Sequence, residues 1–290
     1  MIFVPRSHRV LIIINPTSGS QKSVKIWTSV VEPILKASTA SYEVIFTTHA
    51  GHAGELGEKL ELDSVDVVSS VSGDGLVHKI LNGLGRRESD FGTAMENLPL
   101  TSIPCGSGNT LSTNHLGPKH AKNVQLATLN ILKGTPNRLD LCSSTQLSDG
   151  YLIRNHGRAR RGTEHLRRLG PIRFVLGYLR GAIRNYHQPV VEADLSGLPR
   201  LKYGDIQTKI GGSEDSNSTC PWTIVETDIV SFYAGILPFM SRELLLFPAK
   251  IPGRNGTIDI TLQHSDSVWQ SLACLIGAET GRLFKNPNFL

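Results

Sequence analysis

A unit of strand, loop and helix repeats four times in the first half of the chain. The first strand, Arg9–Ile14, reads RVLIII and is continuously apolar and rich in β-branched residues, as buried parallel strands are. The predicted strands are 9–14, 42–47, 65–71 and 100–103, and the predicted helices are 23–36, 52–60, a helix from residue 76, a short helix after 109, and 124–132. Such alternation predicts a doubly wound α/β fold, with a parallel sheet covered by helices on both faces.

The pattern changes beyond residue 137. Short apolar runs then predict strands at 138–142, 188–195, 229–234 and 257–262, with one helix near 172–186. We therefore expect an N-terminal α/β domain over residues 1–137. A β-rich, antiparallel, sandwich-like C-terminal domain should follow over residues 138–290.

The composition restricts the class of protein only mildly. A formal charge of +5 favours anionic partners without separating nucleic acid, membrane surface and nucleotide. Nine of the arginines fall between residues 154 and 184. The four cysteines form no metal or redox motif, which favours a reduced intracellular setting. The start of the chain lacks the apolar core of a signal peptide, and the longest apolar stretch, 229–240, is too short to span a bilayer.

Glycine-bearing loops follow three of the predicted strands. They read NPTSGS at 15–20, SGDG at 72–75 and PCGSGN at 104–109. Taken singly, each is also compatible with an ordinary turn. Because the carboxyl ends of parallel strands meet at one edge of a sheet, the three loops are expected to converge there. Together they could surround a polyphosphate with backbone donors.

The second loop carries a carboxylate between two glycines. Gly73 and Gly75 let the backbone turn sharply and approach a ligand closely. The amides at the start of the following helix favour anionic groups such as phosphates. An acidic side chain in such a turn is unfavourable unless it binds magnesium or takes a proton, so Asp74 indicates phosphoryl transfer.

Four motifs, in their order along the chain, resemble those of the diacylglycerol-kinase-type lipid kinases and, among them, the sphingosine kinases. The resemblance covers roughly residues 9 to 280. The motifs are Asn15-Pro16-x-Ser18-Gly19, Ser72-Gly73-Asp74-Gly75-Leu76, Pro104-x-Gly106-Ser107-Gly108-Asn109 and Arg167-Arg168-Leu169-Gly170-x-x-Arg173-Phe174. The SGDGL form and the RRLGxxRF string favour the sphingosine kinases over the diacylglycerol kinases. An NAD kinase shares a glycine-aspartate-glycine turn, but the RRLGPIRF string argues against it.

The resemblance implies an ATP site between the two domains, with Asp74 as the catalytic base and Mg2+ bridging the phosphates. It assigns no residue as a direct metal ligand. The implied nucleotide contacts are Asn15, Ser18, Gly19, Thr47, Ser72, Gly73, Gly75, Gly106, Ser107, Gly108, Arg167, Arg173 and Gly256. The implied reaction transfers the γ-phosphate of ATP to the primary hydroxyl of a sphingoid base such as sphingosine. The implied setting is cytoplasmic, with peripheral contact to an anionic membrane surface and no nucleic acid partner.

The substrate segment departs from the family. Where the family holds the amine of the lipid with an aspartate, this chain has Arg160, which leaves Glu164 as the candidate lipid contact. A guanidinium would repel an ammonium group. Either the preferred lipid is uncharged or anionic, or residues 143–165 carry an artefact of gene prediction. The family also usually continues with another strand where this chain stops at Leu290, so we treat the C-terminal domain as truncated. A diacylglycerol or ceramide kinase and a non-catalytic nucleotide-binding relative remain alternatives.

Overall fold

The computed structural model describes the chain in two compact units, which we treat separately. Described are residues 8–17, 22–142, 146–148, 151–153, 191–193, 223–225, 229–253, 256–264 and 278–285. The first unit is drawn from Met1–Ser143 together with two later segments, Leu237–Leu245 and Ala249–Gly256. The second unit is drawn from Ser144–Ile236, Leu246–Pro248 and Thr257–Leu290.

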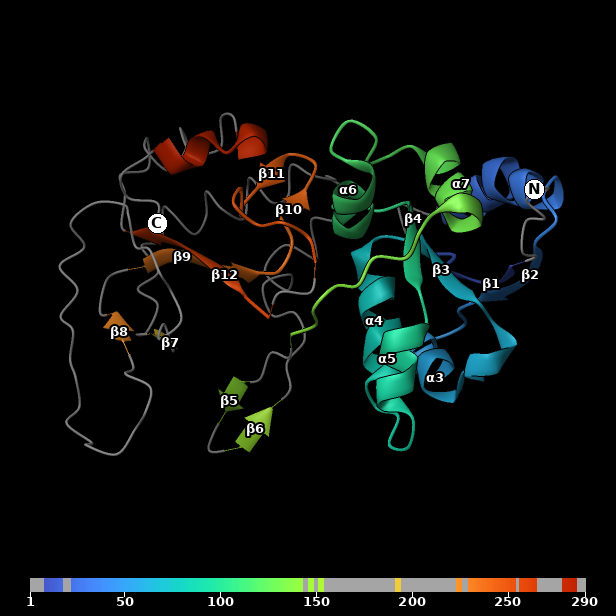
Figure 1. Ribbon diagram of the computed structural model, residues 1–290, viewed down its shortest axis with the longest axis horizontal. Coiled ribbons are helices and arrows are strands. Elements are labelled where there is room, and N and C mark those ends of the chain that lie inside the picture. Colours follow the sequence, from blue (N-terminus) through green and yellow to red (C-terminus); the bar gives the residue numbers. More distant parts are fainter. Residues whose placement is uncertain are drawn as a thin grey trace, which may run out of the picture. The chain divides into compact units, whose positions relative to one another are not determined.

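The first unit is built on a four-stranded parallel sheet (Figure 1). Its strands are β1 (Arg9–Ile14), β2 (Ser41–Phe46), β3 (Val67–Ser72) and β4 (Leu100–Pro104). They lie in the order β2-β1-β3-β4, and every neighbouring pair is parallel. This confirms the predicted doubly wound sheet, with β1 and β3 as its central strands.

Helices cover both faces of this sheet, as Figure 1 shows. The helices are α1 (Ser23–Ile26), the π-helical turn η2 (Trp27–Val31), α2 (Glu32–Lys36), α3 (His52–Lys59), the 3-10 turn η3 (Leu62–Ser64), α4 (Asp74–Leu84), α5 (Phe91–Asn97), α6 (Thr110–Leu116) and α7 (Val124–Lys133). The first three are continuous and occupy the predicted helix 23–36. Helix α5 falls in a stretch that the sequence pattern leaves as a connection. Its only buried residue is Ala94, too weak an apolar signal to mark a helix.

Strand β1 separates two apolar cores. Because side chains alternate along a strand, Ile12 and Ile14 face the core under η2, α2 and α7, while Leu11 and Ile13 face the core under α3, α4 and α5. Ile12 and Ile14 are fully buried, and Trp27 packs in the same core. Burial on both faces explains why the sequence of this strand is continuously apolar rather than alternating.

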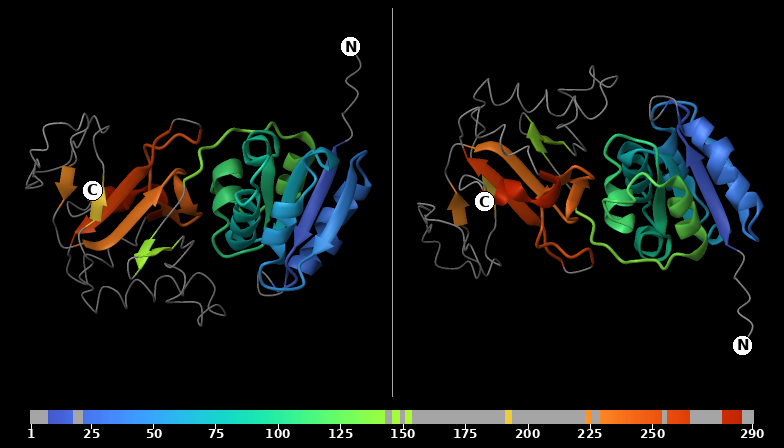
Figure 2. Two further views of the ribbon diagram at one scale, coloured as in Figure 1. Left: turned by 90° about the horizontal axis from the view of Figure 1, so that it is seen from below. Right: turned by 90° about the horizontal axis from the view of Figure 1, so that it is seen from above.

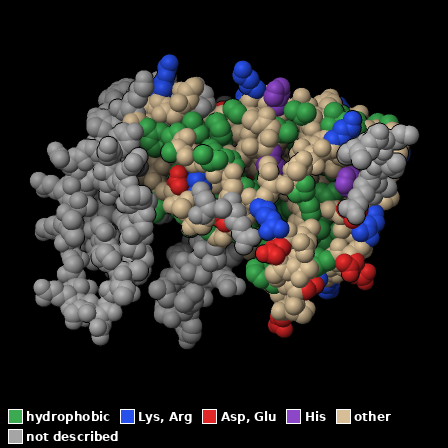
Figure 3. Space-filling view, viewed as in Figure 1, with side chains coloured by type: hydrophobic (Ala, Val, Ile, Leu, Met, Phe, Trp, Pro, Cys, Tyr) green, Lys and Arg blue, Asp and Glu red, His purple; other side chains and the backbone are tan. Residues whose placement is uncertain are grey.

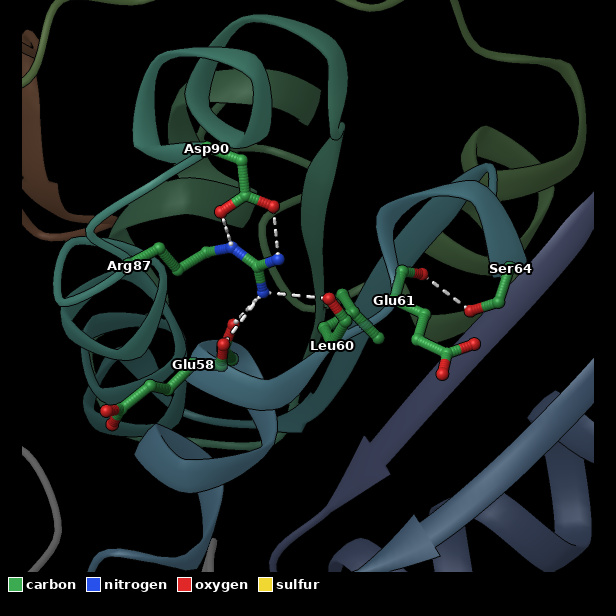
Figure 4. A network of polar contacts seen from close by, with 7 residues as sticks. Glu58, Leu60, Glu61, Ser64, Arg87 and Asp90 are labelled. Atoms are coloured by element: carbon green, nitrogen blue, oxygen red, sulfur yellow. Dashed lines mark hydrogen bonds and ion pairs between the residues drawn. The ribbon is translucent and has the colours of Figure 1, made fainter.

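Arg87, just after α4, caps the C-terminal end of α3 (Figure 4). One guanidinium nitrogen donates to the carbonyl oxygens of Glu58 and Leu60, both at 2.8 Å, while the other side of the fork binds Asp90 in a bidentate pair at 2.7 and 2.5 Å. The Arg87 side chain is only 11% exposed. Its hydrogen bond with Asp90 raises the pKa of Arg87 and lowers the pKa of Asp90. Arg87 therefore satisfies carbonyls that a helix end leaves without partners.

The second unit contains antiparallel strand pairs. Strands β9 (Ile229–Gly235) and β12 (Asp259–His264) run side by side, as both views of Figure 2 show in orange. The other pairs are β5 (Gln146–Ser148) with β6 (Tyr151–Ile153) and β7 (Val191–Ala193) with β8 (Thr223–Val225), and two 3-10 turns span Ala278–Thr280 and Arg282–Lys285. These pairs confirm antiparallel β structure in the C-terminal region.

Two predicted C-terminal elements need comment. The prediction of a strand at 138–142 is wrong, because these residues join no sheet. In that segment the carboxylate of Asp140 accepts the backbone N–H of Gly256 at 2.6 Å. The helix predicted near 172–186 lies outside the described residues.

A short hairpin from late in the chain belongs to the first unit. It pairs β10 (Phe239–Ser241) with β11 (Leu244–Leu245) in antiparallel fashion. Strand β10 lies against α6, as Figure 1 shows. The chain thus returns to its first unit after the 93 residues 144–236. Among the described residues, no helix combines the length and the apolar character needed to cross a membrane.

Candidate functional site

The parallel order of the sheet brings three loops to one edge. Strands β1, β3 and β4 are consecutive neighbours, so the residues that follow them emerge side by side. The hydrogen-bond pattern continues beyond the strands, because Thr47 N donates to Ile14 O at 2.8 Å and Cys105 N donates to Ser72 O at 3.1 Å. The predicted residues Asn15, Thr47 and Ser72 are therefore held at the same edge as the glycine loop after β4.

The side chain of Asn15 organises the first loop. Its Oδ1 accepts hydrogen bonds from the backbone N–H and the hydroxyl of Thr17, at 3.0 and 2.8 Å. Its carbonyl oxygen accepts the hydroxyl of the buried Ser23 at 2.6 Å. These bonds fix the direction in which the chain leaves β1. The next predicted residues of this loop, Ser18 and Gly19, lie outside the described residues.

The second and third loops touch through glycine backbone. A Cβ atom built on Gly106 would lie 2.5 Å from the Cα of Gly73, and one built on Gly73 would lie 3.0 Å from the Cα of Gly106. Only residues without a side chain allow two backbones this close. The pair explains why both loops carry a glycine within two residues of the strand end, and it leaves the backbone itself as the surface that a ligand would meet.

Asn109 closes the third loop, and the sequence reading gave it no role. It has a left-handed backbone, with φ of 54°. Its side chain bonds to Gly106 twice, with Oδ1 accepting from N and Nδ2 donating to O, both at 2.8 Å. Asparagine is one of the few residues besides glycine that adopts this conformation readily, and its short amide can bond to nearby backbone. Those two properties are the signal that could have found it.

Asp74 lies where the second loop becomes α4. It is half-buried, and its Oδ1 accepts the backbone N–H of Thr110 at 2.6 Å. A Cβ on Gly108 would lie 2.7 Å from Asp74 Oδ2, so the third loop presses closely on the carboxylate. Asp74 is also the acidic residue of the first turn of α4, where the helix dipole favours negative charge. The carboxylate is therefore held in one orientation at the loop edge rather than in the protein interior.

The remaining predicted residues divide into those the structure describes and those it does not. Gly75 and Ser107 are half-buried in the second and third loops, and Gly256 has a left-handed backbone with φ of 67° in the first unit. The predicted residues Glu164, Arg160, Arg167 and Arg173 lie outside the described residues. Cys105, at the start of the third loop, is buried, and burial raises the pKa of its thiol to about 11. It is therefore a thiol near neutral pH and a poor nucleophile.

The basic side chains are dispersed on one face of the molecule. On the face seen in Figure 3, the basic side chains lie singly among apolar and polar ones. Within the described part of the chain, no three side chains of the metal-binding types gather into one group. The arginine-rich segment 154–184 lies wholly outside the described residues.

Comparison with known proteins places this arrangement in a family. The family model of the diacylglycerol kinase catalytic domain matches residues 9–144, which contain all three loops. Sphingosine kinase 1 of Mus musculus is 32% identical over 272 aligned positions, which cover 84% of this chain and 69% of that protein. The chain belongs to the sphingosine kinase family.

Other relatives agree with this family assignment. Sphingoid long chain base kinase 4 of Schizosaccharomyces pombe is 32% identical over 292 aligned positions, which cover 93% of this chain and 62% of that protein. The chain spans only 28% of the length of sphingoid long chain base kinase 5 of Saccharomyces cerevisiae, which is 34% identical over 194 positions. It is thus shorter than these two relatives. A crystal structure of a diacylglycerol kinase from Bacillus anthracis str. Sterne shares the fold, with a TM-score of 0.56 at 21% identity, covering 94% of this chain and 78% of that one.

Proposed function

We propose that this chain is a lipid kinase that transfers the γ-phosphate of ATP to the primary hydroxyl of a sphingoid base. The observation that carries the proposal is the carboxylate of Asp74, fixed by the Thr110 amide at the edge where the chain leaves β1, β3 and β4. Its similarity to a sphingoid long chain base kinase and to a sphingosine kinase supports the same activity. In this proposal residues 1–137 bind the nucleotide and residues 138–290 bind the lipid.

The loop edge suits a polyphosphate. The close contact of Gly73 and Gly106 leaves backbone N–H groups as the groups that meet a ligand, and the start of α4 adds the positive end of an eleven-residue helix. Ser72, Gly75, Ser107 and Gly108 would complete this cradle. Asn15 and Thr47 at the neighbouring strand ends would contact the rest of the nucleotide, as would Ser18, Gly19 and Gly256. Arg167 and Arg173 would neutralise phosphate charge with their planar guanidinium groups.

Asp74 would act on the lipid alcohol. The alcohol oxygen forms a bond to the γ-phosphorus as the bond from that phosphorus to the bridging oxygen of ADP breaks, and the alcohol proton passes to the Asp74 carboxylate. Because Oδ1 is already engaged by Thr110, the carboxylate has a fixed orientation and does not need to reorganise during the reaction. Magnesium bound to the phosphates would supply neutralisation of the charge that develops on them. Asp74, whose carboxylate lies at this edge, could also face such an ion.

The lipid substrate of the proposed kinase has two candidates. Arg160 stands where the family places an aspartate for the lipid amine, and this favours an uncharged lipid such as diacylglycerol or ceramide as the second candidate. Sequencing the transcript across codons 143 to 165 tests whether this segment is genuine. A transcript that restores the aspartate removes the reason for the second candidate.

Radiolabelled ATP and a panel of lipids test the proposal directly. The full-length chain should label sphingosine, and Asp74→Asn should lower the rate by roughly 10²- to 10⁴-fold while ATP binding, followed by calorimetry, persists. The matched control is Asp63→Asn, which makes the same chemical change at an exposed residue just before β3, at the opposite edge of the sheet. Labelling of diacylglycerol or ceramide alone would shift the assignment to the second candidate. ATP binding without labelling of any lipid would indicate a non-catalytic, nucleotide-binding relative of the kinases.

We also propose that the chain works in the cytoplasm at the surface of anionic membranes and has no nucleic acid partner. The support is the lipid nature of the substrate and the nine arginines within residues 154–184. Each such arginine contributes about 1 kcal/mol near an anionic surface. Sedimentation with vesicles that contain phosphatidylserine should retain the protein at low salt and release it at high salt. Equal retention by neutral vesicles would contradict the electrostatic part of this proposal.

A further inference from the structure

We infer that the β10–β11 hairpin positions the Asp74 carboxylate through α6, with Thr110 as the positioning residue. This inference rests on the proposed function. Thr110 is the first residue of α6 and uses two different groups at once. Its backbone N–H donates to Asp74 Oδ1 at 2.6 Å, and its hydroxyl donates to the carbonyl oxygen of Met240 at 2.5 Å. One residue therefore links the carboxylate to a strand that lies 130 positions later in the chain.

Asn114 makes the second attachment, one helical turn further along α6. Its side-chain amide donates to Phe239 O at 2.7 Å and accepts from Phe239 N at 3.0 Å. The same amide donates to Thr110 O at 2.8 Å. Both backbone groups of Phe239 are thus satisfied by one side chain. With the hydroxyl of Thr110, this gives α6 three hydrogen bonds to two adjacent residues of β10.

These bonds fix the rotation of α6 about its own axis. The helix has only seven residues, and its first turn must point one particular N–H at Asp74. On the opposite side of α6, the hydroxyl of the buried Ser112 donates to the carbonyl oxygen of Ala121 at 3.1 Å. The hairpin supplies the attachment on the side of Thr110 and Asn114. Without it, the helix keeps its place against the sheet, while the direction of the Thr110 amide is no longer held.

A further contact joins the same two parts of the chain without reaching Asp74. Lys122 lies 4.0 Å from Glu243, and both side chains are nearly half exposed. Exposed pairs of this kind contribute little to stability. This pair therefore offers a matched control, because it connects the hairpin to the segment between α6 and α7 but not to the carboxylate.

The inference is tested with variants of the full-length chain, using kcat, the KM for ATP and the melting temperature as readouts. Thr110→Val, which keeps the shape of the side chain and loses its hydroxyl, should lower kcat roughly tenfold and leave the KM for ATP within about twofold. Thr110→Ser restores a hydroxyl and should recover most of kcat. Asn114→Leu should reproduce the loss from the other attachment point. Lys122→Gln should match the unmodified chain.

Three results would overturn the inference. One is an unchanged kcat in Thr110→Val. Another is a loss of kcat in Thr110→Val that is accompanied by an equal rise in the KM for ATP and a lower melting temperature, and that is not reversed in Thr110→Ser. Such a pattern would indicate general structural damage. If the unmodified chain transfers no phosphate at all, the proposed function fails separately. The inference is then decided by a crystal structure of Thr110→Val, where a carboxylate of Asp74 still bonded to the Thr110 amide would refute it.

Discussion

Replacing Gly108 with alanine places a methyl group against the carboxylate of Asp74. The new Cβ would lie 2.7 Å from Asp74 Oδ2, whereas ordinary contacts begin at 3.4 Å. The carboxylate must therefore move by roughly 0.7 Å. Because the atom that has to move is the end of a flexible side chain, the strain of an off-rotamer shift is only about 1 kcal/mol. A displacement of this size in a reacting group should lower kcat roughly 10- to 100-fold, equivalent to about 1.4 to 2.7 kcal/mol in the barrier.

The assay compares kcat, ATP affinity and melting temperature for Gly108→Ala with two other glycine substitutions. Gly92→Ala in α5 meets nothing within 4 Å and should leave all three unchanged or slightly raise the melting temperature. Gly106→Ala drives a Cβ into the backbone of Gly73 and should lower stability and activity together. The reasoning would be refuted if Gly108→Ala kept full kcat. It would also be refuted if its loss of activity followed a loss of stability as large as that of Gly106→Ala.

Three further predictions concern stability and reactivity. Arg87→Met removes the buried cap of α3 and should lower the free energy of unfolding by about 3 kcal/mol. By contrast, Arg86→Met, which removes an exposed ion pair, should lower it by less than about 1 kcal/mol in the same urea titrations. A hydrogen bond from arginine lowers the pKa of Asp66 to about 2, so its small contribution is present at neutral pH and is lost as pH falls from about 4 toward 2. Accordingly, Asp66→Asn should destabilise at pH 7 and be neutral at pH 2. Iodoacetamide at pH 8 should alkylate the exposed Cys142 and spare Cys105, which peptide mass spectrometry resolves.

The elements of the fold were predicted correctly where the local sequence pattern is strong, and were missed or wrong where it is weak. The strands of the first unit were predictable because a parallel strand buried on both faces must be apolar throughout, as Arg9–Ile14 is. Helix α5 was missed because it buries a single alanine. The strand predicted at 138–142 was wrong because its apolar residues satisfy the pattern of a strand, yet no partner strand runs beside them. Pairing is a property of the whole fold, which a local pattern does not contain.

The amino-acid sequence alone determined the doubly wound sheet and the convergence of three glycine loops on one edge, because parallel strands all end on the same side. It also marked Asp74, since a carboxylate between two glycines has no ordinary packing role. Only the tertiary structure decided what holds that carboxylate. Thr110 lies 36 positions from Asp74, and the hairpin at Met240 lies 130 positions further on. Contacts across such separations leave no periodicity in a single sequence, and they form only when the folded sheet brings the partners within hydrogen-bonding distance.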